Sequence, residues 1–336
     1  MYSKIDSPLT PLNNYDDSAS SAYNVLFLLA GLAVATYAIA RFAESNNNLN
    51  YENRFARILA GLLALMMRML HTKSGDLEIT DTENKLIAIG PHRTGWEAVV
   101  VASKIKGTPP QFLATDAYNK IPGVASFLKM FKAIPVASNV TKGDNRTANS
   151  GALEQASKAL SEKGCVALFP QGNFARLGQQ PPRVYAGAAK LALTNNIPIH
   201  VIRLDGFWSL QNPVIPLFIR NSAYYRAFFS AFHLNNVRAT FACVIDFHLK
   251  PENEHLSEDE KIEEICAQLY AYYRHTQELT DKEVSTIKTE ISDKTHLLIW
   301  KNKVKQDDLG KQLINLKKEE VELEQPTLNS MKLSSV

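Results

Sequence analysis

The stretch KLIAIGPHRTGWE, residues 85–97, decides how the chain is expected to fold. Its first five residues, Lys85–Ile89, form a short apolar run that predicts a β-strand. A polar loop follows, and a helix-like stretch then runs over Trp96–Ile105. Strand, loop and helix in this order form one unit of an α/β fold. In such folds, polar side chains at the carboxyl end of a strand commonly build the functional site.

The same alternation continues along the chain. Further strand-like runs are found at Gln111–Ala114, Ala133–Val136, Cys165–Phe169, Ile197–Leu204 and Ala239–Leu249. Helix-like stretches lie between them at Ile121–Phe131, Asn149–Glu162 and Tyr185–Leu193. Strands that alternate with helices of about ten residues indicate an α/β fold with a mostly parallel sheet flanked by helices. We expect this domain to span residues 77–250.

An uncharged run precedes the expected domain. Ala22–Ala40 has 19 residues without a charge and is followed by Arg41. As a helix rising about 1.5 Å per residue, it would nearly cross a hydrocarbon core of roughly 30 Å. We predict a disordered segment at residues 1–20 and a membrane helix at 21–44, with a helix buried in a soluble protein as the alternative. The cations that follow the run favour a cytoplasmic location for the rest of the chain.

Two other segments leave alternatives open. Residues 54–72 form a second apolar stretch, which either lies in the membrane interface or packs on the domain as a first helix. Residues 251–336 carry 12 lysines and arginines against 18 aspartates and glutamates, whereas residues 1–250 carry 25 against 16. Apolar residues at helical spacing within Ser257–Tyr273 predict a helix. We interpret 251–336 as a charged, solvated helical tail, disordered in part; a coiled-coil or partner-binding role is the alternative.

The polar loop holds the residues best suited to chemistry. His92 can act as a general base near neutral pH, and Glu97 could orient its imidazole. On one continuous helix, residues five apart point about 140° away from each other. The two side chains can therefore meet only if His92 lies in the loop and Glu97 in the first helical turn. The alternative is structural: Thr94-Gly-Trp-Glu97 fits a capping box, in which Glu97 serves only a backbone N–H.

The motifs of the chain, taken together, resemble those of the glycerol-3-phosphate and lysophospholipid acyltransferase family. The family's first signature, H-x4-D, corresponds here to His92-Arg-Thr-Gly-Trp-Glu97. Segments similar to the later blocks follow in the family's order: Asn119–Phe131 and Ala133–Val136 for the second, Leu168–Gly172 for F-P-E-G-T-R, and Gly187–Ala192 with Asn196–Ile199 for the fourth.

This resemblance implies acyl transfer from acyl-CoA or acyl carrier protein to the hydroxyl of a lysophospholipid, with 1-acylglycerol-3-phosphate as the leading acceptor. His92 would take the hydroxyl proton, and Glu97 would orient His92. The third block would bind the acceptor phosphate through Gln171, Gly172, Asn173, Arg176 and Arg183; the alternative is a strand-end turn with surface arginines. The acyl donor is a co-substrate, and no cofactor or metal is expected.

The chain departs from the family's pattern at several positions. Glu97 replaces the usual Asp, and Gln171 stands where the third block has Glu. Asn173 and Phe174 replace the usual Thr-Arg pair, and the second block also lacks its arginine. These changes put the acceptor in doubt more than the chemistry. They also support a competing hypothesis, a weak or inactive family member that binds lipid or a partner protein.

Other function classes lack their motifs. No G-x-S-x-G elbow supports a thioesterase or lipase, and no P-loop supports a nucleotide-dependent enzyme. No H-x-x-x-H or H-E-x-x-H spacing supports a metal site, and we expect no nucleic-acid partner. The sequence thus predicts a membrane-bound enzyme of phospholipid biosynthesis, with its catalytic domain on the cytoplasmic side.

Overall fold

The computed structural model covers the 336-residue chain. It describes residues 79, 83–93, 97–105, 110–116, 118, 125, 128–129, 132–137, 149–172, 182–205, 238–275, 279–310 and 312. The segments expected to be disordered (1–20), to span the membrane (21–44) and to form a second apolar helix (54–72) lie outside these residues. None of the helices that the structure describes combines the length and apolar character that a membrane span requires.

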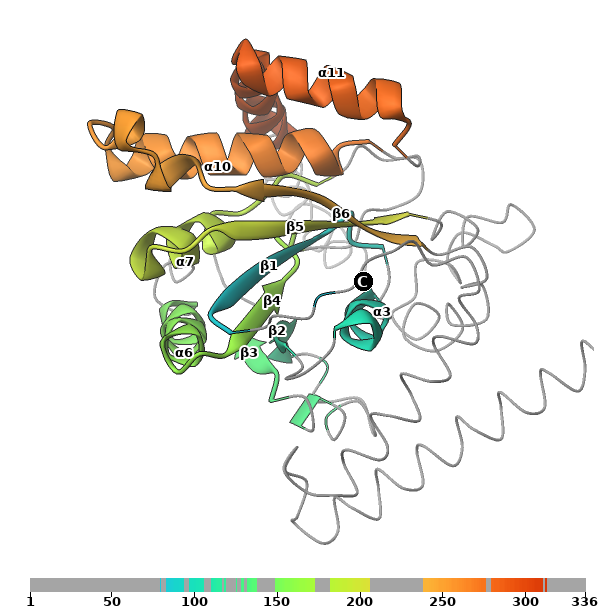
Figure 1. The fold of residues 1–336 in the computed structure, drawn as a ribbon, viewed down its shortest axis with the longest axis vertical. Helices are drawn as coiled ribbons and strands as arrows, with labels where there is room; N and C mark the ends of the chain where they lie inside the picture. The colour runs from blue at the N-terminus through green and yellow to red at the C-terminus, as the bar shows by residue number, and fades with distance from the viewer. Residues whose placement is uncertain are drawn as a thin grey trace, which may run out of the picture.

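A six-stranded sheet forms the centre of the described fold, with strand order β3-β2-β4-β1-β5-β6 (Figure 1). All neighbouring strands are parallel except β5 and β6, which pair antiparallel. The strands are β1 (Lys85–Gly90), β2 (Gln111–Thr115), β3 (Ile134–Val136), β4 (Cys165–Leu168), β5 (Ile199–Asp205) and β6 (Arg238–Ile245). The predicted α/β class with a mostly parallel sheet is confirmed.

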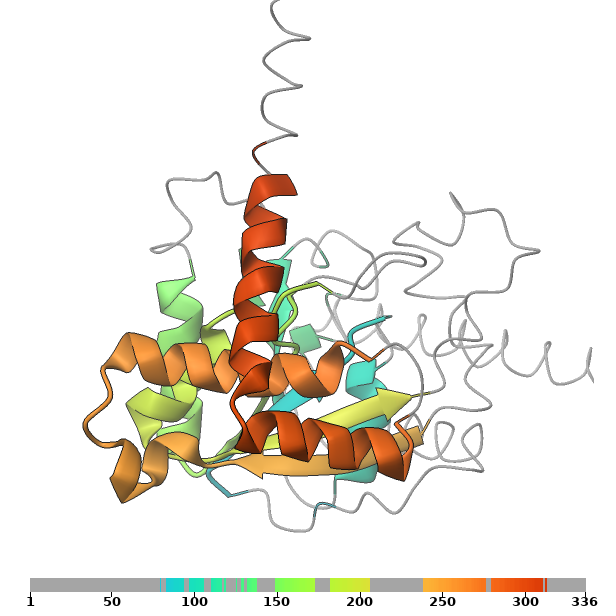
Figure 2. The same cartoon turned by 90° about the horizontal axis from the view of Figure 1, so that it is seen from above.

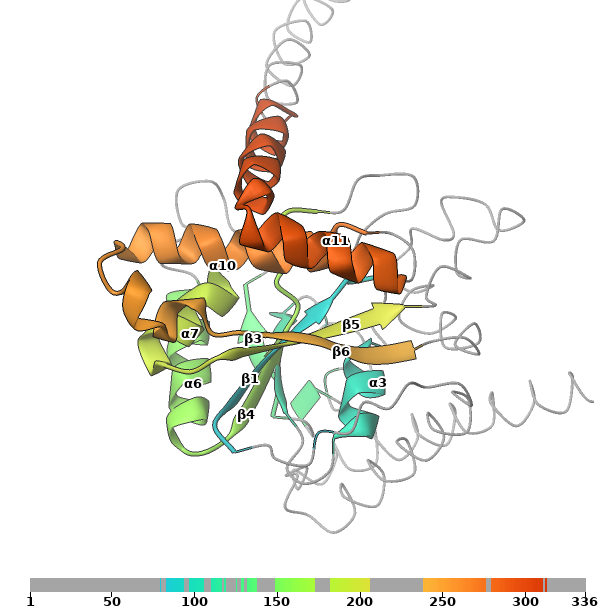
Figure 3. The ribbon, with the colours of Figure 1, turned by 45° about the horizontal axis from the view of Figure 1, so that its top comes forward.

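The strand β1 is buried on both faces of the sheet. Leu86 and Ala88 contribute to one apolar cluster, and Ile87 and Ile89 to the other. Helix α3 (Glu97–Lys104) packs on the second cluster, and the other face carries α6 (Ser150–Ser161), α7 (Gly187–Asn195) and α10 (Glu258–Tyr273), as Figures 1 and 3 show. This double coverage explains why the deciding run is apolar at successive positions instead of alternating.

The last strand is shorter than predicted. We expected it to reach Leu249, but β6 ends at Ile245, which pairs with Ile199, the first residue of β5. Beyond Ile245 the chain therefore has no strand to pair with. It continues instead in two short 3-10 turns, η4 (Phe247–Leu249) and η5 (Pro251–Asn253).

Helix α10 belongs to the core of the fold. A capping box, Ser257 with Glu260, begins the helix, and every residue of its second half, from Glu264 to Tyr273, is buried. The interpretation of everything beyond Pro251 as a solvated tail is therefore wrong for α10. The acidic first turn of the helix dominates its composition, whereas the apolar half packs against the sheet and α7.

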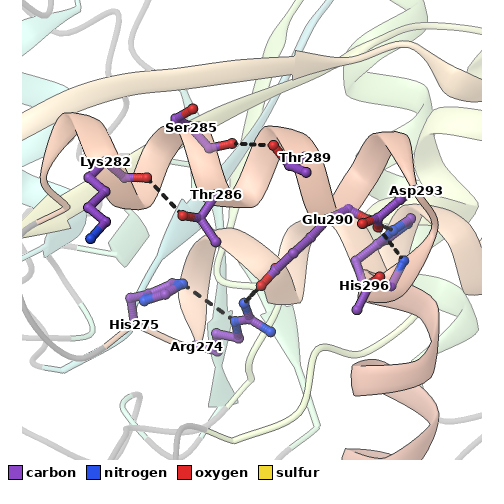
Figure 4. Close-up of polar contacts among 10 residues, drawn as sticks. Arg274, His275, Lys282, Ser285, Thr286, Thr289, Glu290, Asp293 and His296 are labelled. Carbon is purple, nitrogen blue, oxygen red and sulfur yellow. Dashed lines mark hydrogen bonds and ion pairs between the residues drawn. The ribbon is translucent and has the colours of Figure 1, made fainter.

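Two further helices cover the outer side of α10. Helix α11 (Asp281–Ser292) is joined to it by Arg274, whose Nη2 lies 2.6 and 2.5 Å from the two carboxylate oxygens of Glu290 (Figure 4). Residues 295–310 form a last helix, the dark red one that crosses α10 in Figure 2. Its Trp300 is buried against Tyr270, with ring centroids 5.5 Å apart.

The imidazole of His296 fastens this last helix to α10. Its Nε2 lies 2.6 Å from Glu264 Oε1 and its Nδ1 lies 3.0 Å from the carbonyl oxygen of Glu290. Both partners are acceptors when Glu264 is ionised, so both ring nitrogens must donate, and the ring is then an imidazolium. Burial alone would lower the pKa of His296, but the hydrogen bonds and charges of Glu264 and Glu290 together outweigh it and raise that pKa.

This pair predicts a pH-dependent stability. Because the pKa of His296 is higher in the folded chain than its ordinary value of about 6.5, its contribution is fully present below that value. The contribution is lost as the pH rises through the folded pKa. We expect the melting temperature of the wild type to exceed that of His296→Gln at pH 6, with the difference shrinking at alkaline pH. A difference that stays constant across this range would contradict the assignment.

The contact between Gly90 and Tyr273 joins the end of β1 to the end of α10. A Cβ atom added at Gly90 would lie 2.7 Å from atoms of the buried Tyr273 ring. This is closer than carbon atoms can approach. Only glycine therefore fits at Gly90, two residues before His92.

Replacing Gly90 by alanine should destabilise the fold by about 1–3 kcal/mol, the usual cost of overpacking a core. Gly151→Ala is the matched control, because nothing lies within 4 Å of a Cβ at Gly151 and the residue is helical. Alanine should leave stability there unchanged or raise it by up to about 1 kcal/mol. Chemical unfolding measures both variants; equal effects would argue against the close packing of Tyr273.

Candidate active site

The candidate site lies where β1 and β4 end. The two strands are parallel neighbours, with Ala88 paired to Leu168, so the residues that follow them emerge at the same edge of the sheet. His92 follows β1, and Phe169 and Gln171 follow β4. His92 and Gln171, which are 79 positions apart in the sequence, are thereby brought together.

The side chains of His92 and Glu97 are in direct contact. His92 Nδ1 lies 2.5 Å from Glu97 Oε2, and the other carboxylate oxygen accepts a hydrogen bond from the backbone N–H of Arg93. Glu97 is the first residue of α3, so the acid lies in the first helical turn, as the spacing predicts. The carboxylate thus orients the imidazole and also holds the backbone of the preceding loop through the N–H of Arg93. Thr94, the expected N-cap, lies outside the described residues.

This contact determines which nitrogen of His92 can act as a base. An ionised carboxylate only accepts hydrogen bonds, so Nδ1 must carry the proton that it shares with Glu97. In the neutral ring, Nε2 then carries the lone pair. The Glu97 side chain has no exposed surface, whereas 14% of the His92 side chain is exposed. The acid is sheltered from solvent, and the imidazole remains accessible.

Phe169 fixes the plane of the imidazole. The two rings stack with centroids 4.0 Å apart and planes inclined by 17°. Together with the Nδ1 contact, this stacking restrains both the position and the tilt of the His92 ring. Sequence analysis assigned no role to Phe169, although it is the first residue of the segment that resembles F-P-E-G-T-R and directly follows β4, at the edge where His92 emerges.

The buried side chain of Gln171 binds the backbone of the loop that carries His92. Its Oε1 accepts a hydrogen bond of 2.7 Å from the backbone N–H of His92, and its Nε2 lies 3.5 Å from the carbonyl oxygen of Pro182. The residue has no exposed surface. This geometry favours a positioning role for Gln171 over the acceptor contact that the family resemblance implied.

The remaining residues of the third block are placed in part. Gly172 is exposed and has a φ of 62°, a backbone conformation that favours glycine, and an added Cβ would lie 3.1 Å from the Tyr185 ring. Arg183 lies with its guanidinium 5.3 Å from the centre of that ring. Its Nη1 is 3.2 Å from Asp308 Oδ1, so it is paired within the chain. Asn173 and Arg176 lie outside the described residues.

Arg93, Arg203 and Asp205 are buried charged side chains close to the His92 loop. Burial lowers the pKa of Arg93 to about 10, an effect that Glu97 opposes and Arg203 reinforces. Arg203, opposite Gly90 in the sheet register, is 1% exposed and donates to Asp205 and to the carbonyl oxygens of Tyr272 and His275. The end of α10 is thus bound to the strand beside β1. Among the described residues, no group of three His, Cys, Asp or Glu side chains could hold a metal ion.

Comparison with known proteins bears on this geometry. Residues 71–205, which include the loop and all its described partners from β1 to β5, match the family model described as acyltransferase. The chain carries an acyltransferase-family domain. The predicted acyltransferase family is thereby confirmed for this part of the chain.

Structural comparison gives a more distant likeness. The crystal structure of PlsC from Thermotoga maritima, a 1-acyl-sn-glycerophosphate (LPA) acyltransferase, aligns with a TM-score of 0.42 at 14% identity. The alignment covers 72% of this acyltransferase and 92% of PlsC. No curated protein sequence matches the chain significantly.

The positioning role of Gln171 can be tested by two substitutions. Gln171→Leu leaves the His92 N–H without its acceptor, which should destabilise the enzyme by about 1–3 kcal/mol and lower acyl-transfer turnover. Gln171→Glu keeps an acceptor oxygen and should retain most of the turnover. Gln155→Leu, at an exposed position of α6, is the matched control and should change neither quantity. Full turnover in Gln171→Leu would rule out the role.

Proposed function

We propose that this acyltransferase moves a fatty acyl group from an acyl thioester, acyl-CoA or acyl carrier protein, to the hydroxyl of a lysophospholipid, with 1-acylglycerol-3-phosphate as acceptor and His92 as general base. The 2.5 Å contact between His92 Nδ1 and Glu97 Oε2 is the observation that carries the proposal. It leaves Nε2 as the basic atom, next to the carboxyl edge of the sheet.

The reaction follows from these atoms. The acceptor hydroxyl attacks the thioester carbonyl while its proton passes to His92 Nε2, giving a tetrahedral intermediate and an imidazolium. Glu97 stabilises the imidazolium because its carboxylate faces Nδ1. The intermediate then collapses, the C–S bond breaks, and the thiolate leaves with the proton that His92 returns. The products are an ester and a free thiol, and His92 is neutral again.

Glu97 in place of the family's usual Asp is compatible with this role. The longer side chain starts from the first residue of α3 and still meets the imidazole across five residues. Its second oxygen accepts from the Arg93 N–H, which holds the carboxylate in one orientation. Both carboxylate oxygens of the longer side chain thus have hydrogen-bond partners.

A membrane location forms part of the proposal. A lysophospholipid acceptor resides in a bilayer, and the uncharged run Ala22–Ala40 is long enough to anchor the enzyme there. The cations after this run favour the cytoplasmic side for the catalytic domain. The excess of positive charge over residues 1–250 would attract anionic lipid headgroups.

One observation favours the competing hypothesis of an inactive protein that binds lipid or a partner. Arg183, a candidate ligand for the acceptor phosphate, is paired with Asp308. The intact contact of His92 with Glu97, the stacking on Phe169 and the exposure of the imidazole favour catalysis instead. Turnover decides between the two hypotheses.

His92→Ala should lower acyl transfer from acyl-CoA to 1-acylglycerol-3-phosphate by about 100-fold or more, the usual contribution of a general base. Glu97→Gln should also lower turnover sharply. The glutamine oxygen can still accept from the Arg93 N–H. Its NH2 group would then face Nδ1, and because this group only donates hydrogen bonds, it cannot keep Nδ1 as a donor. Glu97→Asp, which restores the family's usual acid, should retain measurable turnover.

Chemical unfolding serves as the control, since all three variants should keep a folded core. Equal turnover in wild type and His92→Ala would support the inactive-protein hypothesis. Full turnover in Glu97→Gln would mean that Glu97 is only a cap.

A further inference from the structure

The helix formed by residues 295–310 reaches the third block of the acyltransferase domain. Asp308 of this helix places Oδ1 3.2 Å from Nη1 of Arg183. The two residues are 125 positions apart in the sequence. The Arg183 side chain is 24% exposed and that of Asp308 is 54% exposed, so water and small anions can reach the pair.

The segment that carries Arg183 lies against the candidate site. The preceding residue, Pro182, faces the amide of Gln171, which in turn binds the backbone of His92. Tyr185 donates its backbone N–H to the carbonyl oxygen of Pro170 at 2.7 Å, and its ring lies beneath the guanidinium. The arginine therefore belongs to a segment fixed against the loop that follows β4.

Asp308 also projects from an anchored element. The helix that carries it is joined to α10 by the contact of His296 with Glu264 and by the packing of Trp300 on Tyr270. Lys303 of this helix is 8% exposed. The helix that carries Asp308 is thus anchored, although the pair itself is open to solvent.

We propose that Asp308 is a selectivity-determining residue, whose carboxylate competes with the acceptor phosphate for the guanidinium of Arg183. The inference rests on the proposed function, which assigns a phosphorylated acceptor to this site. Guanidinium groups bind carboxylates and phosphates through the same fork of N–H donors. A phosphomonoester carries more charge and more acceptor oxygens than a carboxylate, so it can displace Asp308, but it binds less tightly than to an unpaired arginine.

The size of this competition follows from the exposure of the pair. Ion pairs open to solvent are weak, because water screens their attraction, and removing such a competitor should change affinity by about two- to fivefold. The effect should be confined to acceptors with an anionic headgroup. Asp308 would thereby reduce the preference of the enzyme for a phosphorylated acceptor over a neutral one.

Equilibrium binding to the full-length protein in micelles tests this proposal. The probes are 1-acylglycerol-3-phosphate and, as the uncharged comparison, 1-acylglycerol. Asp308→Asn should tighten binding of the phosphorylated probe by about two- to fivefold and leave binding of the neutral probe unchanged. Asp307→Asn is the matched control: it removes the same charge one residue earlier, from a carboxylate that lies 2.8 Å from Lys303.

A second comparison uses the Arg183→Gln background, in which Asp308→Asn should have no effect. Three results would overturn the proposal: no tightening in Asp308→Asn, equal tightening in Asp307→Asn, or tightening that persists without Arg183. Failure of all variants to bind the phosphorylated probe would overturn it as well.

Binding is measured without turnover, so the two proposals fail separately. If the enzyme binds the phosphorylated lipid but His92→Ala does not change its turnover, the proposed catalytic role fails and the Asp308 comparison still stands. If turnover depends on His92 but Asp308→Asn has no effect on binding, only the competition is refuted.

Discussion

The hydrogen bond between His92 Nδ1 and Glu97 Oε2 is the interaction on which the candidate site depends. Residues five apart cannot meet on one helix, so the contact requires that His92 lie in the loop before α3. That loop must in turn begin at a fixed point, which the buried strand β1 provides. The acid fixes the tautomer of the ring, and stacking on Phe169 fixes its plane. Local geometry thus prepares one nitrogen for proton transfer.

The end of α10 also supports the start of the His92 loop. Tyr273 of α10 packs directly on Gly90, and Arg203 binds the carbonyl oxygens of Tyr272 and His275. The start of the His92 loop therefore rests on the end of α10. Because the helix of residues 295–310 is fastened to α10 through His296, this helix is anchored on the side of the fold where Asp308 pairs with Arg183.

Much of this arrangement could be predicted from the sequence, because it is local. The strand–loop–helix order and the meeting of His92 with Glu97 follow from hydrophobic runs and helical geometry alone. The acyltransferase motifs extended the prediction to β4 and α7. Contacts between distant segments could not be predicted in this way. Nothing in the residues around Gln171 indicates that its amide binds the His92 backbone, and nothing around Arg183 indicates a partner 125 positions away. Burial of α10 was missed because its acidic first turn dominates the composition.

The central claim concerns the protonation of one imidazole, and nitrogen NMR of His92 in labelled protein tests it most directly. At a pH where the ring is neutral, the account predicts a proton on Nδ1, directed at Glu97, and a lone pair on Nε2. The two nitrogens have distinct shifts, so the tautomer can be assigned, and Glu97→Gln should abolish the preference. A proton on Nε2 in the wild type would contradict the account, because the nitrogen assigned as the base would then have no lone pair to accept the acceptor's proton.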